Sequence, residues 1–484
     1  MNDYFQIDDT TWNDLDMDEV LKIIDSCKSS VGKEYLRKSL HDTCLDEGLL
    51  LLRSRKSDCL ANDNVLLKGI RKAFSDLGIT KKASFRDYIF RLSEIKPGSN
   101  AKHVILIILL IAAIVMLFIK PLIGIIATVA MFAINISTYF AEKGRIEGYF
   151  QCIKYLCGMV ICAGKLTALG LQGTPFEGDV NRLKELIGIF GPVKRGSWLI
   201  TNSVSGSIVD VIMDYVRMLF HVDLIKFNNS VKTVTGHSGE VDELYNILGE
   251  FELAACIHDF REKYPVNCRP EFITDKKVSF TGLYHPLISD PVTNSLNAEG
   301  SVLLTGSNAS GKSTFLKSIA INQILAQSLY SCLAEQYYCG FFKVMSSMAL
   351  KDNILDNESY FVVEVKSLKR IFDSLGDVPV MCFVDEVLRG TNTGERIAAS
   401  TVILKKLSSS NAVVFAATHD IELCTLLEGC MKNYHFSETV TDTVTFDYKL
   451  KEGPSTSRNA IKLLDMYGFD KDIVEEAERL AKER

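Results

Sequence analysis

The chain has 484 residues, of which 47% are hydrophobic and 24% charged, and its formal net charge at pH 7 is -6. This length exceeds one ordinary domain and predicts two or three. Because the net charge is negative, the chain as a whole does not attract nucleic acid electrostatically. Local basic patches are still compatible with this composition. The acidic, polar opening residues predict no cleavable signal peptide, and thirteen scattered cysteines predict free thiols in a reducing compartment.

The first half of the chain predicts helices interrupted by one apolar block. Residues 11–95 carry apolar side chains at helical spacing, and the breaker KPGSN occupies 96–100. The apolar block covers 103–138, and residues 139–170 return to a helical pattern. Residues 171–204 hold most of the Gly, Pro and Ser of the middle region and predict loops and short elements, whereas 205–263 predict two long helices.

The second half changes pattern near Val278, where short apolar runs begin to alternate with helical stretches. The runs SVLLTG, VPVMCFVDE, NAVVFAATHD and DTVTFDYKL read as strands. This alternation predicts an α/β domain with a mostly parallel sheet covered on both faces. Residues 451–484 end in a predicted helix–turn–helix pair that is broken at Gly468.

A glycine-rich motif predicts a phosphate-binding loop. The stretch GSNASGKS from Gly306 fits G-x-x-x-x-G-K-[ST], between the strand SVLL and a helix, and this context disfavours a chance turn. In such a loop the backbone N–H groups and the helix N-terminus face phosphate, Lys312 reaches the β- and γ-phosphates, and the Ser313 hydroxyl binds Mg²⁺. The predicted nucleotide contacts are Gly306, Ser307, Asn308, Ala309, Ser310, Gly311, Lys312, Ser313 and Thr314.

Two further strand ends carry polar side chains. VMCFVDE ends in Asp385, predicted to hold Mg²⁺ through water, and Glu386, predicted to polarise the attacking water. VVFAATHD ends in His419, predicted to sense the γ-phosphate; solvated acids and a structural histidine are the alternatives. Because ligands sit at the carboxyl ends of strands in open α/β sheets, the pattern predicts ATP and Mg²⁺ as cofactors, with Lys312, Glu386 and His419 catalytic.

These segments resemble the MutS family of mismatch-repair ATPases, a branch of the ABC ATPases. The resemblance lies in TGSNASGKSTFLKSIAINQILAQ, ESYFVVEVKSLKRIF, FVDEVLRGTNTGERIAAS, ATHDIEL and LYHPLI, and more weakly in the opening helices. It implies an ABC-type P-loop ATPase domain over 271–450, an all-α lever and core domain over 1–102 and 139–270, and a dimerisation element over 451–484. It also implies a homodimer through the ATPase domains, in which Ser359 reaches the γ-phosphate of the neighbouring subunit; capping of the following helix is the alternative role.

The sequence departs from this family at two places. The lever-like segment begins near residue 10, which predicts a short variant without the mismatch-reading domain and its Phe-x-Glu motif. Phe140-Ala-Glu142 and Phe436-Ser-Glu438 match the tripeptide in other contexts. The family stacks adenine on an aromatic residue before the phosphate loop, where this chain has Val292, so base selectivity is expected to be weaker.

The apolar block predicts a transmembrane hairpin over 103–138. Its arms, 104–119 and 122–134, have no polar face, which is typical of helices in lipid or in a large core. The first arm would be about 24 Å long, short of a hydrocarbon core of about 30 Å. Because both flanks resemble one lever domain, we expect a two-pass or re-entrant hairpin with Lys120-Pro121 at its tip, rather than a single span or a buried core hairpin. Basic residues on both flanks favour a cytoplasmic location for them: Arg91, Lys96, Lys102, Lys143 and Arg145.

The sequence therefore predicts a membrane-anchored, MutS-like dimeric ATPase in the inner or plasma membrane, with its ATPase domain in the cytoplasm. ATP would close the two nucleotide domains and move the levers. The expected partners are a second copy, membrane lipid and DNA, the last in a repair or recombination role. The alternative is a nucleotide-dependent scaffold or switch at the membrane that does not bind DNA.

Overall fold

The computed structural model describes residues 3–80, 98–196, 208–307, 310–348, 360–388, 391–440, 444–455 and 468–482. The chain forms two compact units. The sheet unit consists of Met1–Asp25, Arg37–Ser54 and Asp259–Arg484, and the helical unit of Ser26–Leu36 and Arg55–His258. The division falls inside three helices, α3 (Ser30–His41), α4 (Glu47–Asn62) and α12 (Ser238–Lys263). The domain boundaries expected from the sequence at 102, 138, 270 and 450 stay predictions.

The helical unit contains one long helix where loops and short elements were expected. These were predicted over residues 171–204, but most of this stretch is the 18-residue helix α9 (Glu177–Lys194). Its buried side chains recur at helical spacing, and their burial outweighs its glycines and Pro192, which lies near its end. The other described helices of this unit are α5 (Asn64–Leu77), α7 (Ala101–Ile119), α8 (Pro121–Thr167), α10 (Ile208–Phe220) and α11 (Val222–Gly236).

The stretch 205–263 contains three described helices instead of the two expected. α10 and α11 are separated at His221, which takes a left-handed conformation with φ of 48°. That conformation breaks the regular hydrogen-bonding of a single long helix. The third helix, α12, begins at Ser238 and is continuous to Lys263.

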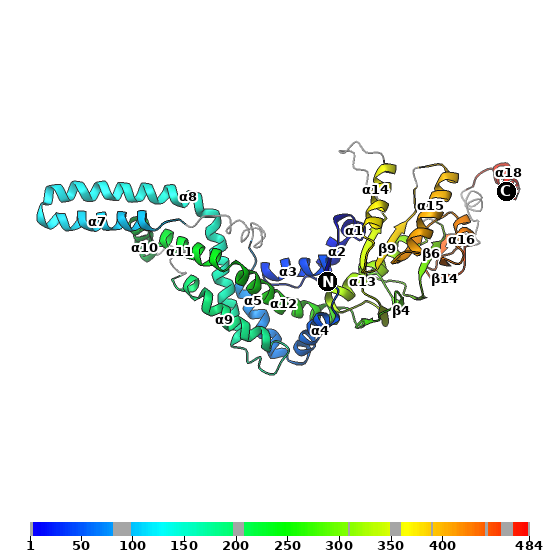
Figure 1. Ribbon diagram of the computed structural model, residues 1–484, viewed down its shortest axis with the longest axis horizontal. Helices are drawn as coiled ribbons and strands as arrows, with labels where there is room; N and C mark the ends of the chain where they lie inside the picture. Colours follow the sequence, from blue (N-terminus) through cyan, green and yellow to red (C-terminus); the bar gives the residue numbers. More distant parts are fainter. Residues whose placement is uncertain are drawn as a thin grey trace. The chain divides into compact units, whose positions relative to one another are not determined.

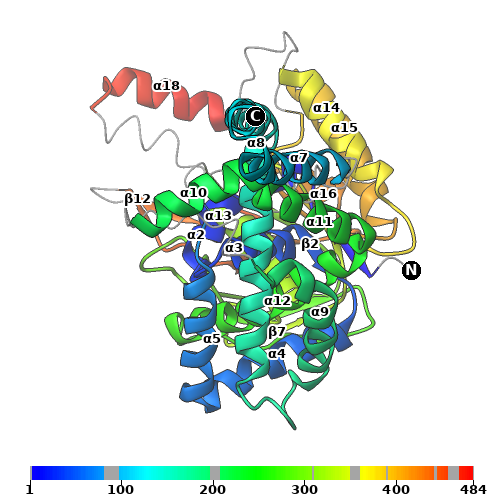
Figure 2. The same cartoon turned by 90° about the vertical axis from the view of Figure 1, so that its left-hand side faces the viewer.

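The apolar block forms a helical hairpin. Helices α7 and α8 run side by side, joined at Lys120, and α8 continues through 47 residues into the body of the helical unit (Figures 1 and 2). Near the tip only glycine fits at position 124, because an added Cβ would lie 2.4 Å from the backbone nitrogen of Leu117. With 19 residues, α7 is about 28 Å long, which is longer than the arm expected from the sequence.

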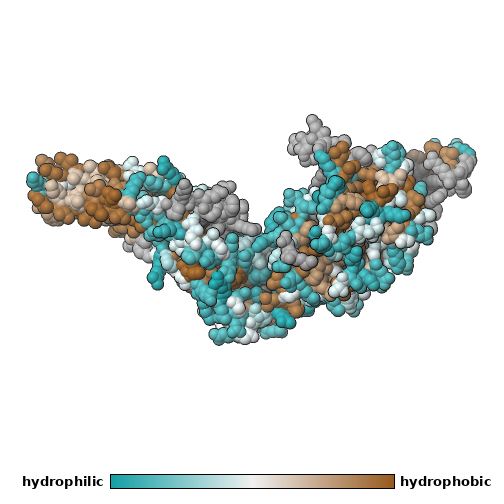
Figure 3. All heavy atoms as spheres, in the orientation of Figure 1, coloured by the Kyte–Doolittle hydropathy of each residue, from teal (hydrophilic) through white to brown (hydrophobic). Residues whose placement is uncertain are grey.

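The side chains of this hairpin are apolar and largely exposed. Among the described residues, two helical segments are long and apolar enough to cross a membrane, Ala101–Ile119 and Pro121–Glu147, and only 17% of the most apolar window of each is buried. Figure 3 shows the pair as a hydrophobic surface, brown at the left of the view. The hairpin is therefore not packed as a core in this structure, as the buried alternative would require.

The sheet unit is built on a six-stranded sheet with the order β14-β11-β6-β10-β9-β8. All neighbouring pairs are parallel except β11 with β14, so the mostly parallel sheet predicted from the sequence is present. Its strands are β6 (Ser301–Thr305), β8 (Lys343–Ser347), β9 (Val380–Asp385), β10 (Ala412–Ala417), β11 (Met431–His435) and β14 (Lys451–Glu452).

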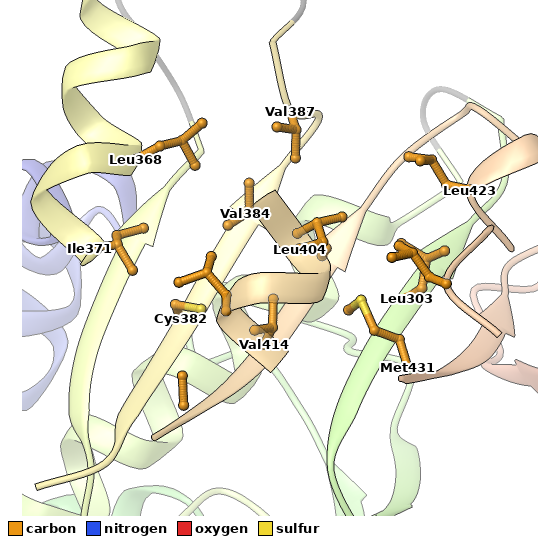
Figure 4. Close-up of a cluster of buried hydrophobic side chains, with 14 of the residues drawn as sticks. Leu303, Leu368, Ile371, Cys382, Val384, Val387, Leu404, Val414, Leu423 and Met431 are labelled. Carbon is orange, nitrogen blue, oxygen red and sulfur yellow. The ribbon is translucent and has the colours of Figure 1, made fainter. Parts of the chain in front are cut away.

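Helices cover both faces of this sheet. On one face alternate residues of β9 and β10, such as Cys382 and Val414, pack with Leu368 of α14 (Tyr360–Asp373) and Leu404 of α15 (Thr393–Ser408) (Figure 4). The strands β8, β9 and β10 also contact α13 (Lys312–Leu329), and the intervening strand residues are equally buried. Burial on both faces explains why these strands read as continuous apolar runs.

Smaller sheets complete the unit, and the sequence reading did not anticipate them. A mixed four-stranded sheet has the order β3-β7-β4-β5, and the run DTVTFDYKL supplies β13 of a two-stranded pair instead of a strand of the main sheet. The remaining described elements are β1 (Tyr4–Gln6), β2 (Asp42–Cys44), β3 (Glu271–Phe272), β4 (Val278–Leu283), β5 (Asn294–Ala298), β7 (Gln336–Cys339), β12 (Glu438–Val440), β13 (Val444–Phe446), α1 (Asp9–Asp14), α2 (Met17–Ile24), α16 (Glu422–Leu426) and α18 (Lys471–Lys482). The first helix of the expected C-terminal pair falls largely outside the described residues.

The N-terminal helix α1 packs on the sheet. The carboxylate of Asp14 accepts hydrogen bonds from the Ser346 hydroxyl (2.7 Å) and from the backbone N–H of Met348 (2.9 Å). Thr11 Oγ1 accepts a further bond from the N–H of Ser346. These contacts bind the opening residues of the chain to the end of the edge strand β8.

Candidate nucleotide site

Three strands of the main sheet end side by side. In β6 and β10 Leu304 pairs with Ala417, and in β9 and β10 Asp385 pairs with Ala417. The strands are parallel, so the segments that leave them emerge at one edge of the sheet. The glycine loop (residues 306–313), the two acids after β9 and His419 after β10 are brought together by this register.

The glycine loop is closed by its own lysine. Nζ of Lys312 donates hydrogen bonds to the carbonyl oxygens of Gly306 (2.7 Å) and Ser307 (2.8 Å), and its side chain is buried. Gly306 and Gly311 have φ values of 143° and 103°, conformations that L side chains rarely adopt. A Cβ at Gly306 would lie 2.7 Å from the carbonyl oxygen of Phe436, so the loop needs glycine there.

A hydroxyl and a carboxylate meet beside this loop. Ser313, in the first turn of α13, donates a 2.5 Å hydrogen bond from Oγ to Oδ2 of Asp385, which is largely buried. Among the described residues no group of three or more His, Cys, Asp or Glu side chains could hold a metal ion. A Mg²⁺ ion at this pair would take its other ligands from phosphate and water, which is how Mg²⁺ commonly binds with nucleotides.

Glu386 and His419 form the next pair. Oε1 of Glu386 lies 3.3 Å from Nδ1 of His419, and the backbone N–H of Glu386 donates to the carbonyl of Ala417. Glu386 has φ of 59°, a strained conformation for a residue other than glycine, and such strain clusters at functional sites. The neighbouring Asp420 is held by two hydrogen bonds from Arg396, of 2.8 and 2.6 Å. The bidentate contact fixes the segment that carries His419.

A cavity of about 660 Å³ opens at this edge of the sheet, a volume within the range of small-molecule sites. The Ser310 hydroxyl is buried beside it without a hydrogen-bond partner among the described residues. An unsatisfied buried hydroxyl and a loop whose glycine positions admit no side chain are the features that a bound phosphate would use. The lining includes Glu386, Tyr448, the segments 290–292 and 310–315, and His285.

Tyr448 is one of the lining residues that the sequence analysis did not predict. Its ring lies next to Gly311, since a Cβ on that glycine would be 3.1 Å from Cδ1 of the ring. The backbone is held by a hydrogen bond from Asn294 Nδ2 to the Tyr448 carbonyl, of 3.0 Å. Val292 lines the same cavity. The residue was hidden because its segment, DYKL, reads as the end of a strand.

His285 is a buried histidine on the cavity wall. Burial, reinforced by the positive charge of Lys317, lowers the pKa of His285 to about 4. Its Nδ1 accepts a hydrogen bond from the backbone N–H of Leu287, which requires that nitrogen to be unprotonated. The ring is therefore neutral at ordinary pH.

The remaining predicted site residues divide into two groups. Thr314 lies in the first turn of α13 and lines the cavity, and the Ser307 hydroxyl donates to the carboxylate of Glu438 (2.7 Å). Asn308, Ala309 and Ser359 lie outside the described residues. In the segment that follows Ser359, the buried carboxylate of Glu364 accepts a hydrogen bond from the backbone N–H of Leu388, just after the acid pair.

Comparison with known proteins agrees with this geometry. The family model described as MutS domain V matches residues 302–483, which include the glycine loop, both acids and His419. This part of the chain, residues 302–483, is therefore similar to MutS domain V. The resemblance seen in the sequence motifs is thereby confirmed.

Individual MutS relatives match parts of the chain. MutS protein homolog 4 from Mus musculus is 34% identical over 230 residues, which are 43% of this chain and 24% of that protein. The DNA mismatch repair protein MutS of Natronomonas pharaonis is 27% identical over 267 residues, 53% of this chain and 31% of the relative. The DNA mismatch repair protein MutS of Thermus aquaticus is 28% identical over 244 residues, which are 49% of this chain and 30% of that protein. The chain thus spans about a quarter to a third of these relatives.

Proposed function

We propose that this MutS-like chain binds and hydrolyses ATP at the edge of its main sheet, within a P-loop ATPase domain. The observation that carries the proposal is the hydrogen bond between Ser313 and Asp385 beside the Lys312 loop, with Glu386 next along the chain. A hydroxyl, a carboxylate and an ammonium converge where a nucleotide's phosphates and their metal would lie.

In this mechanism each group has one task. Lys312 and the backbone N–H groups of the loop hold the phosphates, and Ser313 with Asp385 orients Mg²⁺, which supplies charge neutralisation when bound. Glu386 accepts a proton from water as the water oxygen attacks the γ-phosphorus and the bond to the bridging oxygen of ADP breaks. His419 lies beside Glu386 and would hold the γ-phosphate or the phosphate released.

The base of the nucleotide has an aromatic partner available. The Tyr448 ring borders the cavity beside Gly311, and Val292 lines the same cavity. An aromatic face offers stacking to a purine without strict selection between bases. We assign Tyr448 as the stacking residue and expect modest discrimination of ATP from GTP.

The binding test uses the full chain and a labelled ATP analogue. Lys312→Ala should abolish binding, because it removes the buried ammonium that lies against the loop proposed to hold the phosphates. Lys432→Ala, which removes an exposed lysine of β11, is the matched control and should bind as the parent does. Equal binding by both variants would reject the assignment of the loop.

The proposed assembly is a homodimer that closes on ATP, with Ser359 acting on the neighbouring subunit's nucleotide. A γ-phosphate held on one side by the loop still needs donors on the other. Mixing a Lys312→Ala chain with a Ser359→Ala chain, each inactive alone, creates one intact composite site per heterodimer. Partial recovery of ATPase activity is the expected result, and no recovery would mean that Ser359 works only within its own chain.

We further propose that the dimer acts on DNA in a repair or recombination process. Support comes from the relatives, which are named for DNA mismatch repair or as a MutS homolog. Binding to duplex DNA should weaken steeply as salt rises, because phosphate contacts release counterions. If no binding is seen at low salt, with or without ATP, the alternative of a nucleotide-dependent scaffold at the membrane is favoured.

The α7–α8 hairpin is the proposed membrane anchor, with the ATPase domain in the cytoplasm. Its support is the apolar, mostly exposed surface of two helices of near-spanning length. In intact cells, added cysteines at Ser99 and Arg145 should both escape an impermeant maleimide, and one at Lys120 should react if the hairpin crosses fully. Reaction at only one of Ser99 and Arg145 would establish a single span instead.

A further inference from the structure

Helix α10 (Ile208–Phe220) runs across the hairpin. It packs against α8 and α7 within the helical unit. In Figure 1, where the hairpin lies horizontally, α10 is seen nearly end-on beneath α7. In Figure 2, which looks along the hairpin, α10 is seen from the side. Its axis is therefore transverse to α7 and α8.

Buried polar contacts fix the end of α10 to one level of the hairpin. Nδ2 of Asn135 in α8 donates to the carbonyl of Leu219 (3.0 Å), and Nε2 of His221 lies 3.0 Å from the carbonyl oxygen of Asn135. Nδ1 of His221 lies 3.0 Å from Nδ1 of His103 in α7. The side chains of Asn135, His221 and His103 are all buried, so this attachment is part of the packed structure.

That level is the boundary between the charged and apolar parts of the hairpin. Lys102 and Glu142 form an ion pair of 3.0 Å between α7 and α8. From there toward the tip, α7 has no Asp, Glu, Lys or Arg up to Lys120, and α8 has none between Pro121 and Glu142. The attachment of α10 thus lies where the hairpin would leave the hydrocarbon and enter the head groups.

Part of the described surface of α10 is apolar and exposed. Val211, Ile212 and Tyr215 are 53%, 57% and 57% exposed, and their spacing places them on one side of the helix. The 13 residues of α10 make about 20 Å of helix, too short to cross about 30 Å of hydrocarbon. A short transverse helix with an apolar face suits a position in the plane of a membrane surface.

We propose that α10 lies in the head-group region of a bilayer, with Val211, Ile212 and Tyr215 inserted, and thereby sets how deeply the hairpin enters. The proposal rests on the membrane insertion proposed above. Lipid is the occupant that fits, because α10 packs against a hairpin whose own apolar side chains are largely exposed, and tyrosine favours membrane interfaces. A second copy fits poorly, since three half-exposed side chains cannot supply the ~800 Å² per partner of a stable protein interface.

The test is depth-dependent fluorescence quenching of the full chain in phosphatidylcholine–phosphatidylglycerol vesicles with brominated acyl chains. One tryptophan is added at a time, by Tyr215→Trp in α10, Ile111→Trp midway along α7, or Tyr4→Trp in the sheet unit. Each variant is compared with the parent, whose own tryptophans supply the background. The readout is the difference between bromines near the head group and bromines near the chain end.

The tryptophan added by Tyr215→Trp should be quenched at least twofold more by shallow than by deep bromines. The one added by Ile111→Trp should show the reverse order, and the one added by Tyr4→Trp should not be quenched. Quenching in the Ile111→Trp variant without quenching in the Tyr215→Trp variant would overturn the α10 proposal and leave the hairpin inserted.

Two other outcomes would also decide against the proposal. A concentration-dependent blue shift of the Tyr215→Trp emission without quenching would overturn it and assign the face to a second copy. If neither the Ile111→Trp nor the Tyr215→Trp variant is quenched, membrane insertion itself fails and the α10 proposal falls with it.

Discussion

The hydroxyl of Ser313 donates a 2.5 Å hydrogen bond to the carboxylate of Asp385, which joins the first turn of α13 to the end of β9 across 72 residues of sequence. Asp385→Asn keeps the shape of this contact but removes the negative charge that attracts Mg²⁺. We expect half-maximal binding of a fluorescent ATP analogue to need about tenfold more Mg²⁺, a loss of about 1.4 kcal/mol. The measurement is a Mg²⁺ titration at fixed nucleotide, with Asp373→Asn at an exposed position of α14 as the control. An unchanged midpoint in Asp385→Asn would remove this residue from the metal site.

Because His285 is buried, we expect the free energy of unfolding to decrease in acid. Its folded-state pKa is about 4, below the ordinary value of 6.5, so the unfolded chain binds the proton first as the pH falls. The free energy of unfolding therefore decreases between pH 6.5 and 4, and His285 accounts for about 2–3 kcal/mol of that loss from pH 7.5 to 4.5. His285→Gln should flatten the profile by this amount, measured by denaturant unfolding at the two pH values. Equal slopes in the parent and in His285→Gln would contradict the account.

From the contacts of Asp14 with β8 we expect the opening residues of the chain to stabilise the sheet unit. Asp14→Ala leaves the Ser346 hydroxyl and the Met348 N–H without the carboxylate that they contact in the interior. The expected cost is about 2–4 kcal/mol of unfolding free energy, because buried polar groups lose their acceptor. Asp9→Ala, on the exposed side of α1, is the matched control. If both variants unfold at the same denaturant concentration, the contact with β8 contributes nothing measurable.

The main sheet and its edge were predictable because their signals are local. The glycine loop needs particular residues at fixed spacing, and strands buried on both faces read as unbroken apolar runs before Asp385 and His419. Parallel pairing then places all the strand ends together, whichever helices connect them. Tyr448 could not be predicted in this way. It follows a short pair of strands, and strands of this length give no periodic pattern in the sequence.

The errors in the helical region have a different cause. Residues 171–204 were expected to form loops and short elements because of their Gly, Pro and Ser content, yet burial of Val180, Leu183 and Phe190 stabilises the long helix α9. The break at His221 depends on its contacts with Asn135 and His103, which are distant in sequence. Amino-acid composition reports only the local conformational preference of a segment. In these segments the packing of side chains in the folded structure overrides that preference.

The central claim is that Glu386 activates water for ATP hydrolysis, and single-turnover hydrolysis by Glu386→Gln tests it most directly. The amide cannot accept a proton, so the variant should bind ATP as the parent does and hydrolyse it at least about 100-fold more slowly. Glu428→Gln, an exposed carboxylate beyond α16, should hydrolyse ATP at the parent rate. Hydrolysis by Glu386→Gln at the parent rate, with ATP binding intact, would contradict the assignment.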